Sequence, residues 1–385
     1  MKPNSNIPNE LLSSAQIVAS IDDLLTEIFL RLPMKSLCRF KLVSKNWDSI
    51  ISDPGFSLLR NPDPNPSVGL IFSVPTSPSK GPYAKVLSFD KSTNPQIRTL
   101  ENFSNPFPCK ILSSCNGLLL ISSISGTYNC GYPVRYFICN PTTGKYFGLP
   151  ETDEREDYVY CFKAYLAFDP SRSPHYKVVC ARELPYNKRK YQYQYQLEVY
   201  SSETGCWRKF GGPLSGHVNF SRGVYLNGAI HWISYYSSMK SSYIKLDDDD
   251  DEMPHEMPTP PHAGSTPYYY FGESCGRLHF IQGHMEVNVM VFNVLEMSTD
   301  YSEWFVKYKI DNFNFTCRDF KICSLVWGKK DEDSFLVFKF PGEFLRCNLA
   351  DRTFETIYKF NGSNAKKCLQ YIESLCSTYV LPVDL

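Results

Sequence analysis

The sequence has neither an excess of charge nor a long apolar run. In 385 residues, 40 lysine and arginine residues are balanced by 40 aspartate and glutamate residues. Such a chain has no overall field to attract nucleic acid or an anionic membrane, and no stretch approaches the roughly 18 apolar residues of a membrane helix. Residues 1–20 are polar, lack a signal-peptide pattern and are expected to be disordered. We therefore expect neither nucleic acid nor a membrane as a partner.

Motifs for catalysis and metal binding are also missing. The sequence has no Gly-rich phosphate loop, no Gly-x-Ser-x-Gly and no His-Glu-x-x-His. Its 14 cysteines include no Cys-x-x-Cys pair, so a zinc module is not expected. Their scatter through the chain favours a reducing compartment, the cytosol or the nucleus. We expect no cofactor, no metal site and no catalytic residue.

The N-terminal part of the sequence predicts three short helices. In IDDLLTEIFLRLP, which begins at Ile21, apolar residues recur every three or four positions, and Pro33 ends the pattern. A second helix is predicted at about 33–41. Ser44 can cap a third helix, which ends at Asp-Pro-Gly and has an inward face of Trp47, Ile50 and Ile51.

This helical region has more apolar surface than three short helices can hide from water, so a partner is expected to cover the rest. One alternative is a self-contained three-helix bundle in which the leucines are all core. Another is a helix-turn-helix DNA-binding domain. The third helix disfavours DNA binding because Lys45 is its only basic residue, against Asp48 and Asp53.

The run IDDLLTEIFLRLPMKSLCRFKLVSKNWDSIISDPGF resembles the F-box. The family opens with Leu-Pro where this chain has Ser20-Ile21, so Ile21 offers the apolar contact without the rigid turn. The resemblance implies binding to a Skp-family adaptor, which itself binds a cullin. It implies seven adaptor-binding residues: Ile21, Leu24, Leu25, Ile28, Pro33, Leu37 and Val43. The residues expected to support the F-box from within are Leu32, Phe40, Trp47 and Ile50.

After a proline-rich linker at 61–67, short apolar strands alternate with turns to the C-terminus. One recurring phrase is a turn and a buried strand: CNGLLLIS, LNGAIHWIS and CGRLHFIQ. Its glycines, Gly117, Gly228 and Gly276, are 111 and 48 residues apart, close to two repeats and one repeat of about 50 residues. A second phrase is a strand, a turn and a strand bearing an aromatic residue, as in ICNPTTGKYFGLP and LEVYSSETGCWRKF. The pattern predicts a kelch-like β-propeller over residues 68–385, with room for roughly six blades.

The same region resembles the F-box-associated domain of plant F-box proteins. The resemblance is carried, in family order, by SSCNGLLLI, YFICNPTTGKYFGLP, YLAFDPSRSPHYKVV, LEVYSSETGCWRKF, VYLNGAIHWIS and YIESL. It implies a propeller-like fold and a role in substrate binding. The predicted architecture is thus a small all-α F-box of three helices at 21–60, followed by an all-β propeller.

Two further expectations concern the propeller. Closure of a propeller joins its ends, so Val68–Val74 should pair with Tyr371–Val380. The acidic segment 247–267 reads as a solvated insertion of disordered composition. Substrate-binding residues are not assigned, although loops such as the one around Tyr186 and Asn187 are favoured over that segment.

The function expected is that of a non-catalytic, substrate-recognition adaptor in a Skp-cullin-F-box ubiquitin ligase, which recruits an unknown protein substrate through the β domain. His231 and His279 occupy the same place in two copies of one phrase, as expected of structural positions. The alternative function is a propeller scaffold or small-ligand-binding protein outside a ligase, which uses its helices for assembly.

Overall fold

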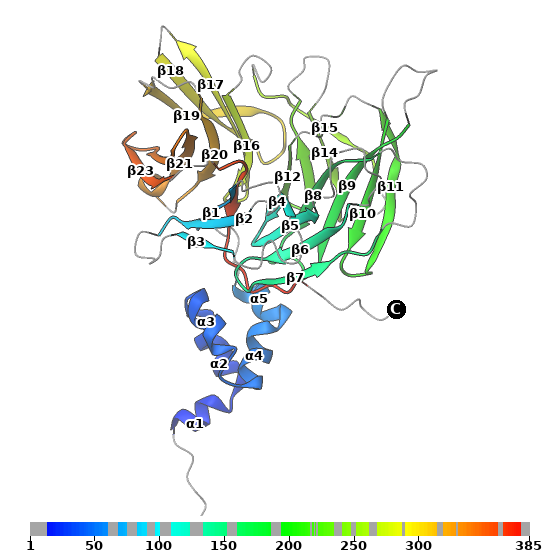
Figure 1. Cartoon of the computed structure of the whole chain (residues 1–385), viewed down its shortest axis with the longest axis vertical. Helices are drawn as coiled ribbons and strands as arrows, with labels where there is room; N and C mark the ends of the chain where they lie inside the picture. Colours follow the sequence, from blue (N-terminus) through cyan, green and yellow to red (C-terminus); the bar gives the residue numbers. More distant parts are fainter. Residues whose placement is uncertain are drawn as a thin grey trace, which may run out of the picture.

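The structure is a computed structural model, and it places a small group of helices beside a ring of β-sheets (Figure 1). It describes residues 14–60, 68–74, 83–90, 97–100, 109–123, 134–151, 160–185, 194–215, 218, 220, 222–234, 241–247, 252–261, 268–286, 289–313, 319–328, 330–360 and 365–378. The predicted linker at 61–67 and the loop around Tyr186 and Asn187 lie outside these residues.

The described N-terminal residues form five helices, two more than predicted. They are α1 Ser14–Ala19, α2 Asp22–Leu30, α3 Met34–Phe40, α4 Lys45–Ser52 and α5 Pro54–Arg60. As predicted, the Ser44 side chain caps α4, accepting a hydrogen bond from the Trp47 amide at 3.1 Å. The expectation that residues 1–20 are disordered does not hold for residues 14–19, which form α1; Ala15, Gln16 and Ala19 favour a helix, but it is too short to show a period.

Helix α5 was missed because its first residues were taken only as the end of α4. The Asp53 side chain accepts a hydrogen bond from the Gly55 amide at 2.7 Å, so it caps a new helix. Pro54 stands at the first helical position, where its missing N–H and fixed φ suit a helix start. The same three residues therefore end one helix and begin the next.

Six sheets of four antiparallel strands follow. From the innermost strand outward, blade 1 contains β24 Cys368–Tyr371, β1 Gly69–Val74, β2 Tyr83–Ser88 and β3 Ile97–Thr99. Blade 2 contains β4 Cys109–Cys115, β5 Leu118–Ser123, β6 Tyr136–Asn140 and β7 Lys145–Gly148. Blade 3 contains β8 Tyr160–Phe168, β9 Tyr176–Glu183, β10 Gln194–Ser201 and β11 Cys206–Ser215.

Blades 4 to 6 repeat this order. Blade 4 contains β12 Gly223–Leu226, β13 Ala229–Trp232, β14 Ser241–Lys245 and β15 His255–Met257. Blade 5 contains β16 Tyr268–Ser274, β17 Arg277–Glu286, β18 Val289–Met297 and β19 Trp304–Phe313. Blade 6 contains β20 Lys321–Val326, β21 Phe335–Phe340, β22 Glu343–Asn348 and β23 Phe354–Lys359, with a short 3₁₀ turn at Asp331–Asp333 between β20 and β21.

The two ends of the propeller close the ring, as predicted. The first strand of each blade contacts the first strand of the next, in the cyclic order β24, β4, β8, β12, β16, β20 and back to β24. C-terminal β24 pairs antiparallel with β1, from Gly69 opposite Tyr371 to Phe72 opposite Cys368. The expected partner, 371–380, was placed too late in the sequence, because residues 372–378 leave the sheet after Tyr371.

The glycine phrase of the sequence marks one turn in three different blades. Asn116-Gly117, Asn227-Gly228 and Cys275-Gly276 all have positive φ and connect the first two strands of blades 2, 4 and 5. Two residues with positive φ form the tight hairpin turn whose twist matches the flanking strands. The spacing of 111 and 48 residues therefore spans two blades and then one.

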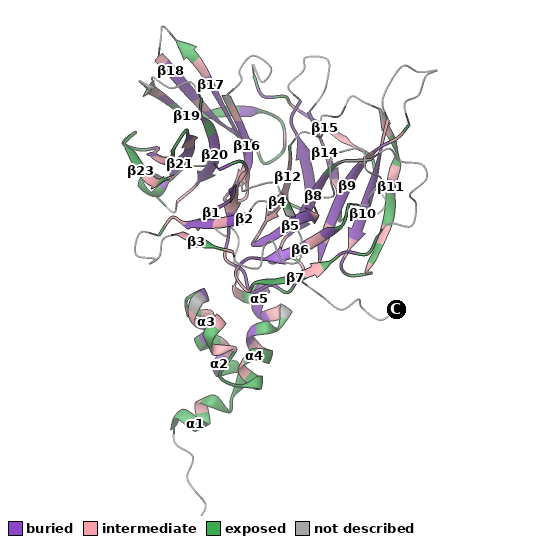
Figure 2. Ribbon diagram, viewed as in Figure 1, coloured by how far each residue is buried: buried purple, intermediate pink, exposed green. Residues whose placement is uncertain are grey.

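Each junction between neighbouring blades encloses its own buried apolar cluster. The rings of Phe292 and Phe338 lie 5.4 Å apart between blades 5 and 6, and those of Phe72 and Phe344 lie 5.2 Å apart between blades 6 and 1. Burying one such side chain stabilises the fold by about 1.5–3 kcal/mol. The buried residues accordingly follow the inner and middle strands, while exposed ones follow the outer strands (Figure 2).

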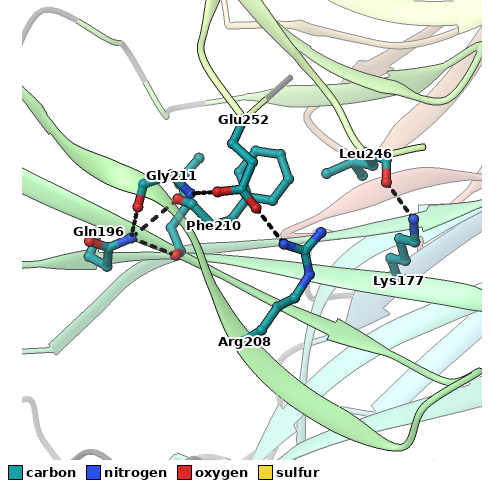
Figure 3. Close-up of polar contacts among 8 residues, drawn as sticks. Lys177, Gln196, Arg208, Phe210, Gly211, Leu246 and Glu252 are labelled. Carbon is teal, nitrogen blue, oxygen red and sulfur yellow. Dashed lines mark hydrogen bonds and ion pairs between the residues drawn. The ribbon is translucent and has the colours of Figure 1, made fainter. Parts of the chain in front are cut away.

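The acidic segment 247–267 is not simply a solvated insertion. It contains β15, the outer strand of blade 4, and Glu252 ties it to blade 3. One Glu252 oxygen accepts a hydrogen bond from the Gly211 amide at 2.7 Å, and the other pairs with Arg208 (Figure 3). The strand was missed because three residues between prolines are too few to show a period of two.

Candidate docking surface

Helices α2 to α5 enclose one small core. Its fully buried members are Leu25 and Phe29 of α2, Leu37 of α3 and Ile51 of α4, with Phe56 from α5. The rings of Phe29, Phe40 and Trp47 lie 5.2–5.9 Å apart from one another. The four residues assigned to support the fold all pack against this core while partly exposed: Leu32, Phe40, Trp47 and Ile50.

The structure divides the seven predicted adaptor-binding residues into two groups. Leu25 and Leu37 are 3% and 0% exposed, so they belong to the core of the helices. Neighbouring residues on a helix point about 100° apart, which is why Leu24 and Leu25 cannot share a face. We therefore remove Leu25 and Leu37 from the docking assignment.

The other five residues are exposed to solvent: Ile21, Leu24, Ile28, Pro33 and Val43. Leu24 and Ile28 are 44% and 43% exposed and lie one turn apart on α2, so they form one apolar stripe. Covering the exposed half of each such side chain is worth on the order of 1 kcal/mol. A partner that seats on several of them gains several kcal/mol.

Exposed apolar residues that were not singled out extend this surface along the chain. Leu42, in the turn between α3 and α4, is 87% exposed and directly precedes Val43. Ile17 of α1 is also exposed. Two adjacent apolar residues between helices are a signal that could have identified Leu42, because such turns are ordinarily polar. We call Ile21, Leu24, Ile28, Leu42 and Val43 the apolar docking face.

Polar contacts hold the helices that carry this face. The Asn46 side-chain amide donates a hydrogen bond to the Asp22 carboxylate at 2.9 Å, which joins α4 to the start of α2. At the other end of α2, the Arg60 guanidinium donates to the carbonyl oxygens of Leu30 at 2.9 Å and Leu32 at 2.6 Å. Arg60 thus satisfies carbonyl groups that a helix end leaves without partners.

A C-terminal segment, 372–378, joins the helices to the propeller, and we call it the strap. Leu375 of the strap is buried within the helical core itself. On its other side, the Asn140 side-chain amide donates to the carbonyl oxygens of Ser374 and Cys376 at 3.0 and 2.8 Å. The strap therefore contacts both parts of the protein, close to where α5 meets the propeller in Figure 1.

The two histidines noted in the sequence lie inside the propeller. His231 and His279 are 0% and 1% exposed and stand at matching places in β13 and β17. The Nε2 atom of His231 lies 2.9 Å from the Tyr301 hydroxyl, and that of His279 lies 3.1 Å from a Glu296 carboxylate oxygen. Over the described part of the chain, no group of three or more His, Cys, Asp or Glu side chains could hold a metal ion.

None of the described helices is both long enough and apolar enough to cross a membrane.

Short helices that expose an apolar face, followed by a closed six-bladed propeller, define a two-part protein of the F-box and β-propeller class. Residues 21–59 match the family model of the F-box domain, and residues 71–249 match that of the F-box associated beta propeller domain. The chain belongs to the family of F-box proteins with an associated propeller.

Two relatives come from Arabidopsis thaliana. The chain is 31% identical to the F-box protein At5g07610 over 379 residues, which cover 90% of this chain and 87% of that protein. It is 27% identical to the F-box/kelch-repeat protein At3g23880 over 255 residues, which cover 62% of this chain and 65% of that protein.

Proposed function

We propose that this protein is the non-catalytic, substrate-recognition adaptor of a Skp-cullin-F-box ubiquitin ligase. The observation that carries the proposal is the apolar docking face, which the F-box leaves uncovered on an otherwise complete helical core. An F-box with such a face suits a Skp-family adaptor as its partner, and the cullin joins through that adaptor. The propeller recruits a protein substrate for ubiquitination, in the cytosol or nucleus.

We assign different roles to the exposed and the buried residues of the F-box. Ile21, Leu24, Ile28 and Val43 contact the Skp-family adaptor, with Leu42 added to them. Pro33, also exposed, fixes the turn between α2 and α3 and remains a candidate contact. Leu25 and Leu37 act indirectly, because they set the shape of the helices from inside.

Pull-down of the full chain with a purified Skp-family adaptor tests this assignment. Ile28→Asp should abolish binding, because an uncompensated charge in a desolvated interface costs several kcal/mol. The matched control is Val306→Asp in β19, which also changes an exposed apolar residue to a carboxylate, but on an outer propeller strand. It should bind the adaptor as the unchanged chain does.

Leu25→Arg separates docking from folding. This change should unfold the helices, visible as loss of helical circular dichroism, whereas Ile28→Asp should leave the helical signal intact. Adaptor binding that survives Ile28→Asp would remove the docking face from the proposal.

The second candidate function is a propeller scaffold or small-ligand-binding protein outside a ligase. Capture of the chain from cells decides between the two, since the adaptor assignment requires that a Skp-family subunit and a cullin co-purify with it. Capture of the intact chain without either subunit would favour the scaffold.

A further inference from the structure

The six inner strands of the propeller all begin on the same face. Hydrogen bonds join the ends of neighbouring inner strands, from Cys115 to the Phe168 carbonyl and from Cys275 to the Trp327 carbonyl, so the ends share one face and the starts lie on the other. The strap leaves the end of β24 and contacts Asn140 and Thr142 at the turn between β6 and β7. The helices therefore lie on the face where inner strands end, and the starts form the face away from them.

A basic residue stands at or close to the start of five of the six inner strands. The cations stand within the first four residues of β4, β8 and β20 or directly before β12 and β24: Lys110, Lys163, Arg222, Lys321 and Lys367. The first four of these are exposed. The sixth inner strand, β16, starts with tyrosines, and the Arg222 guanidinium lies 5.0 Å above the ring of Tyr269. We call the five basic residues the cationic ring.

Lys367 lies close enough to other members of the ring to be affected by their charges. Its ammonium group donates a hydrogen bond at 2.6 Å to the carbonyl oxygen of Leu112, at a bulge in β4. Burial, and then the positive charges of Lys110, Lys163 and Arg222, lower the pKa of Lys367 to about 8. Charges from three other inner strands thus act on one group in a fourth.

Further positive charge adjoins the ring in blade 6. Lys339 of β21 stands directly opposite Lys321 of β20 in the antiparallel register. Like charges placed opposite each other destabilise a sheet, and the charges of Lys110, Lys163 and Arg222 disfavour a charge on Lys367. An anion seated among them would remove that cost.

Acidic residues balance the basic ones in the net charge of the chain, but several of them lie away from the cationic ring. Asp247, which opens the acidic run, pairs with Arg172 at 3.0 Å and Lys177 at 3.8 Å, at the face where inner strands end. Glu252 pairs with Arg208 on outer strand β11. Two described carboxylates stand near the starts of the inner strands: Asp319, two residues before Lys321, and Glu183 of β9, which lies opposite Tyr160 at the start of β8. The segment 152–159, before β8, carries four more carboxylates and lies outside the described residues.

We propose that the cationic ring binds an acidic segment of the protein substrate, rich in Asp and Glu, on the propeller face away from the F-box. This inference rests on the proposed role of the propeller as the substrate-binding part. A peptide fits better than nucleic acid, because five cations around one axis neutralise a short anionic segment. Nucleic-acid binding usually requires basic residues spread along an extended surface, to follow the phosphate backbone. This chain has no net positive charge.

Fluorescence anisotropy with a labelled Glu-rich peptide and the full chain tests the proposal. Lys110→Glu combined with Arg222→Glu reverses two exposed charges of the ring and should weaken binding at least about tenfold. The matched control is Lys145→Glu combined with Lys359→Glu, which reverses two exposed charges on the outer strands β7 and β23. Binding to the control should match that of the unchanged chain.

Competitors identify the ligand. Raising the salt from about 0.05 to about 0.3 M should weaken binding to the unchanged chain more than to the ring variant, because exposed charges are screened. Tighter binding of a phosphorylated peptide of the same length would support the site and identify a modified substrate. Equal affinity for an RNA oligonucleotide, equal loss of binding in the control variant, or an unchanged chain that does not bind the peptide would overturn the proposal.

Adaptor binding separates this inference from the proposed function. The ring variant should still bind the Skp-family adaptor, and Ile28→Asp should still bind the peptide. A chain that binds the adaptor but not the peptide contradicts the cationic ring alone. A chain that binds the peptide but not the adaptor contradicts the proposed ligase role alone.

Discussion

The side-chain amide of Asn140, at the end of β6, donates a 3.0 Å hydrogen bond to the carbonyl oxygen of Ser374 in the strap. The same amide reaches the Cys376 carbonyl, and Leu375 between them is buried among the F-box helices. One turn of blade 2 therefore fixes the segment on which the F-box rests. This contact holds the docking face in a set direction relative to the propeller.

Asn140→Ala should release the strap. Asn140 is fully buried, and its side chain also accepts hydrogen bonds from the Thr142 and Thr143 amides at 2.8 and 3.2 Å. Leaving the strap carbonyls without donors should lower the free energy of unfolding by about 2–4 kcal/mol. Hydrogen exchange should accelerate in 372–378, and urea denaturation should show the loss of stability.

Asn348 provides the matched control, because it forms the same turn in blade 6. It accepts hydrogen bonds from the Ala350 and Asp351 amides at 2.8 and 3.2 Å, but its side-chain amide donates to the carbonyl oxygen of Glu332 in blade 6 rather than to the strap. Asn348→Ala should destabilise its turn and leave exchange in 372–378 unchanged. If both variants exchange alike in the strap, Asn140 does not anchor it.

Deletion of residues 368–385 should make the protein aggregate. The deletion removes β24, so β1 loses its partner from Gly69 to Phe72 and becomes the unpaired edge of an open ring. Light scattering and size-exclusion chromatography measure the outcome. A truncated chain that stays monomeric with an unchanged melting temperature would show that the propeller does not depend on closure by β24.

Most of the fold could be predicted because its signals are local. The phrases CNGLLLIS, LNGAIHWIS and CGRLHFIQ each encode a hairpin turn with positive φ, and the spacing of their glycines gave the blade repeat. The helices α2 to α4 follow from apolar period and capping. Helix α1 and strand β15 escaped because six and three residues are too few to show a period.

The candidate site could be predicted only in part. A sequence pattern gives the face of a helix but not how deeply a neighbouring helix covers it, so Leu25 and Leu37 were grouped with residues that remain exposed. The role of the strap could not be predicted from the sequence for another reason. Leu375 completes the core of helices at the far end of the chain, a contact that depends on the closed ring bringing both termini together.

His231 should make the propeller less stable in mild acid. Burial lowers the pKa of His231 to about 4, against about 6.5 in an unfolded chain. Between these two pKa values the imidazole is protonated in the unfolded state but not in the folded state. The contribution of neutral His231 to the free energy of unfolding is therefore complete above about pH 6.5 and is lost as the pH falls toward 4. The loss amounts to roughly 3 kcal/mol.

Urea denaturation between pH 7 and pH 4.5 measures this effect. His231→Phe should be less stable at pH 7, because it loses the Tyr301 hydroxyl contact, but its stability should fall less steeply with acid. His284→Gln changes a partly exposed histidine beside Glu286 near the end of β17 and should alter the slope much less than His231→Phe does. Identical slopes for the chain and the His231 variant would show that His231 is not the group responsible.

Two glycines, in blades 2 and 5, share a backbone conformation but not their surroundings. Gly117 and Gly276 have φ values of 90° and 69° and occupy the same turn in blades 2 and 5. A Cβ atom at Gly117 would lie 2.2 Å from the Ser374 Cβ of the strap, whereas one at Gly276 would meet nothing within 4 Å. Gly276→Ala therefore reports the cost of positive φ alone, about 1–2 kcal/mol.

Gly117→Ala should cost more than Gly276→Ala, because the strap must move away from blade 2. Thermal denaturation should rank the two variants in that order, and hydrogen exchange in 372–378 should accelerate only for Gly117→Ala. Because Leu375 belongs to the F-box core, faster exchange should extend to the F-box helices as the strap is displaced. Equal melting temperatures would mean that the strap yields without cost, and the F-box would then not be held by blade 2.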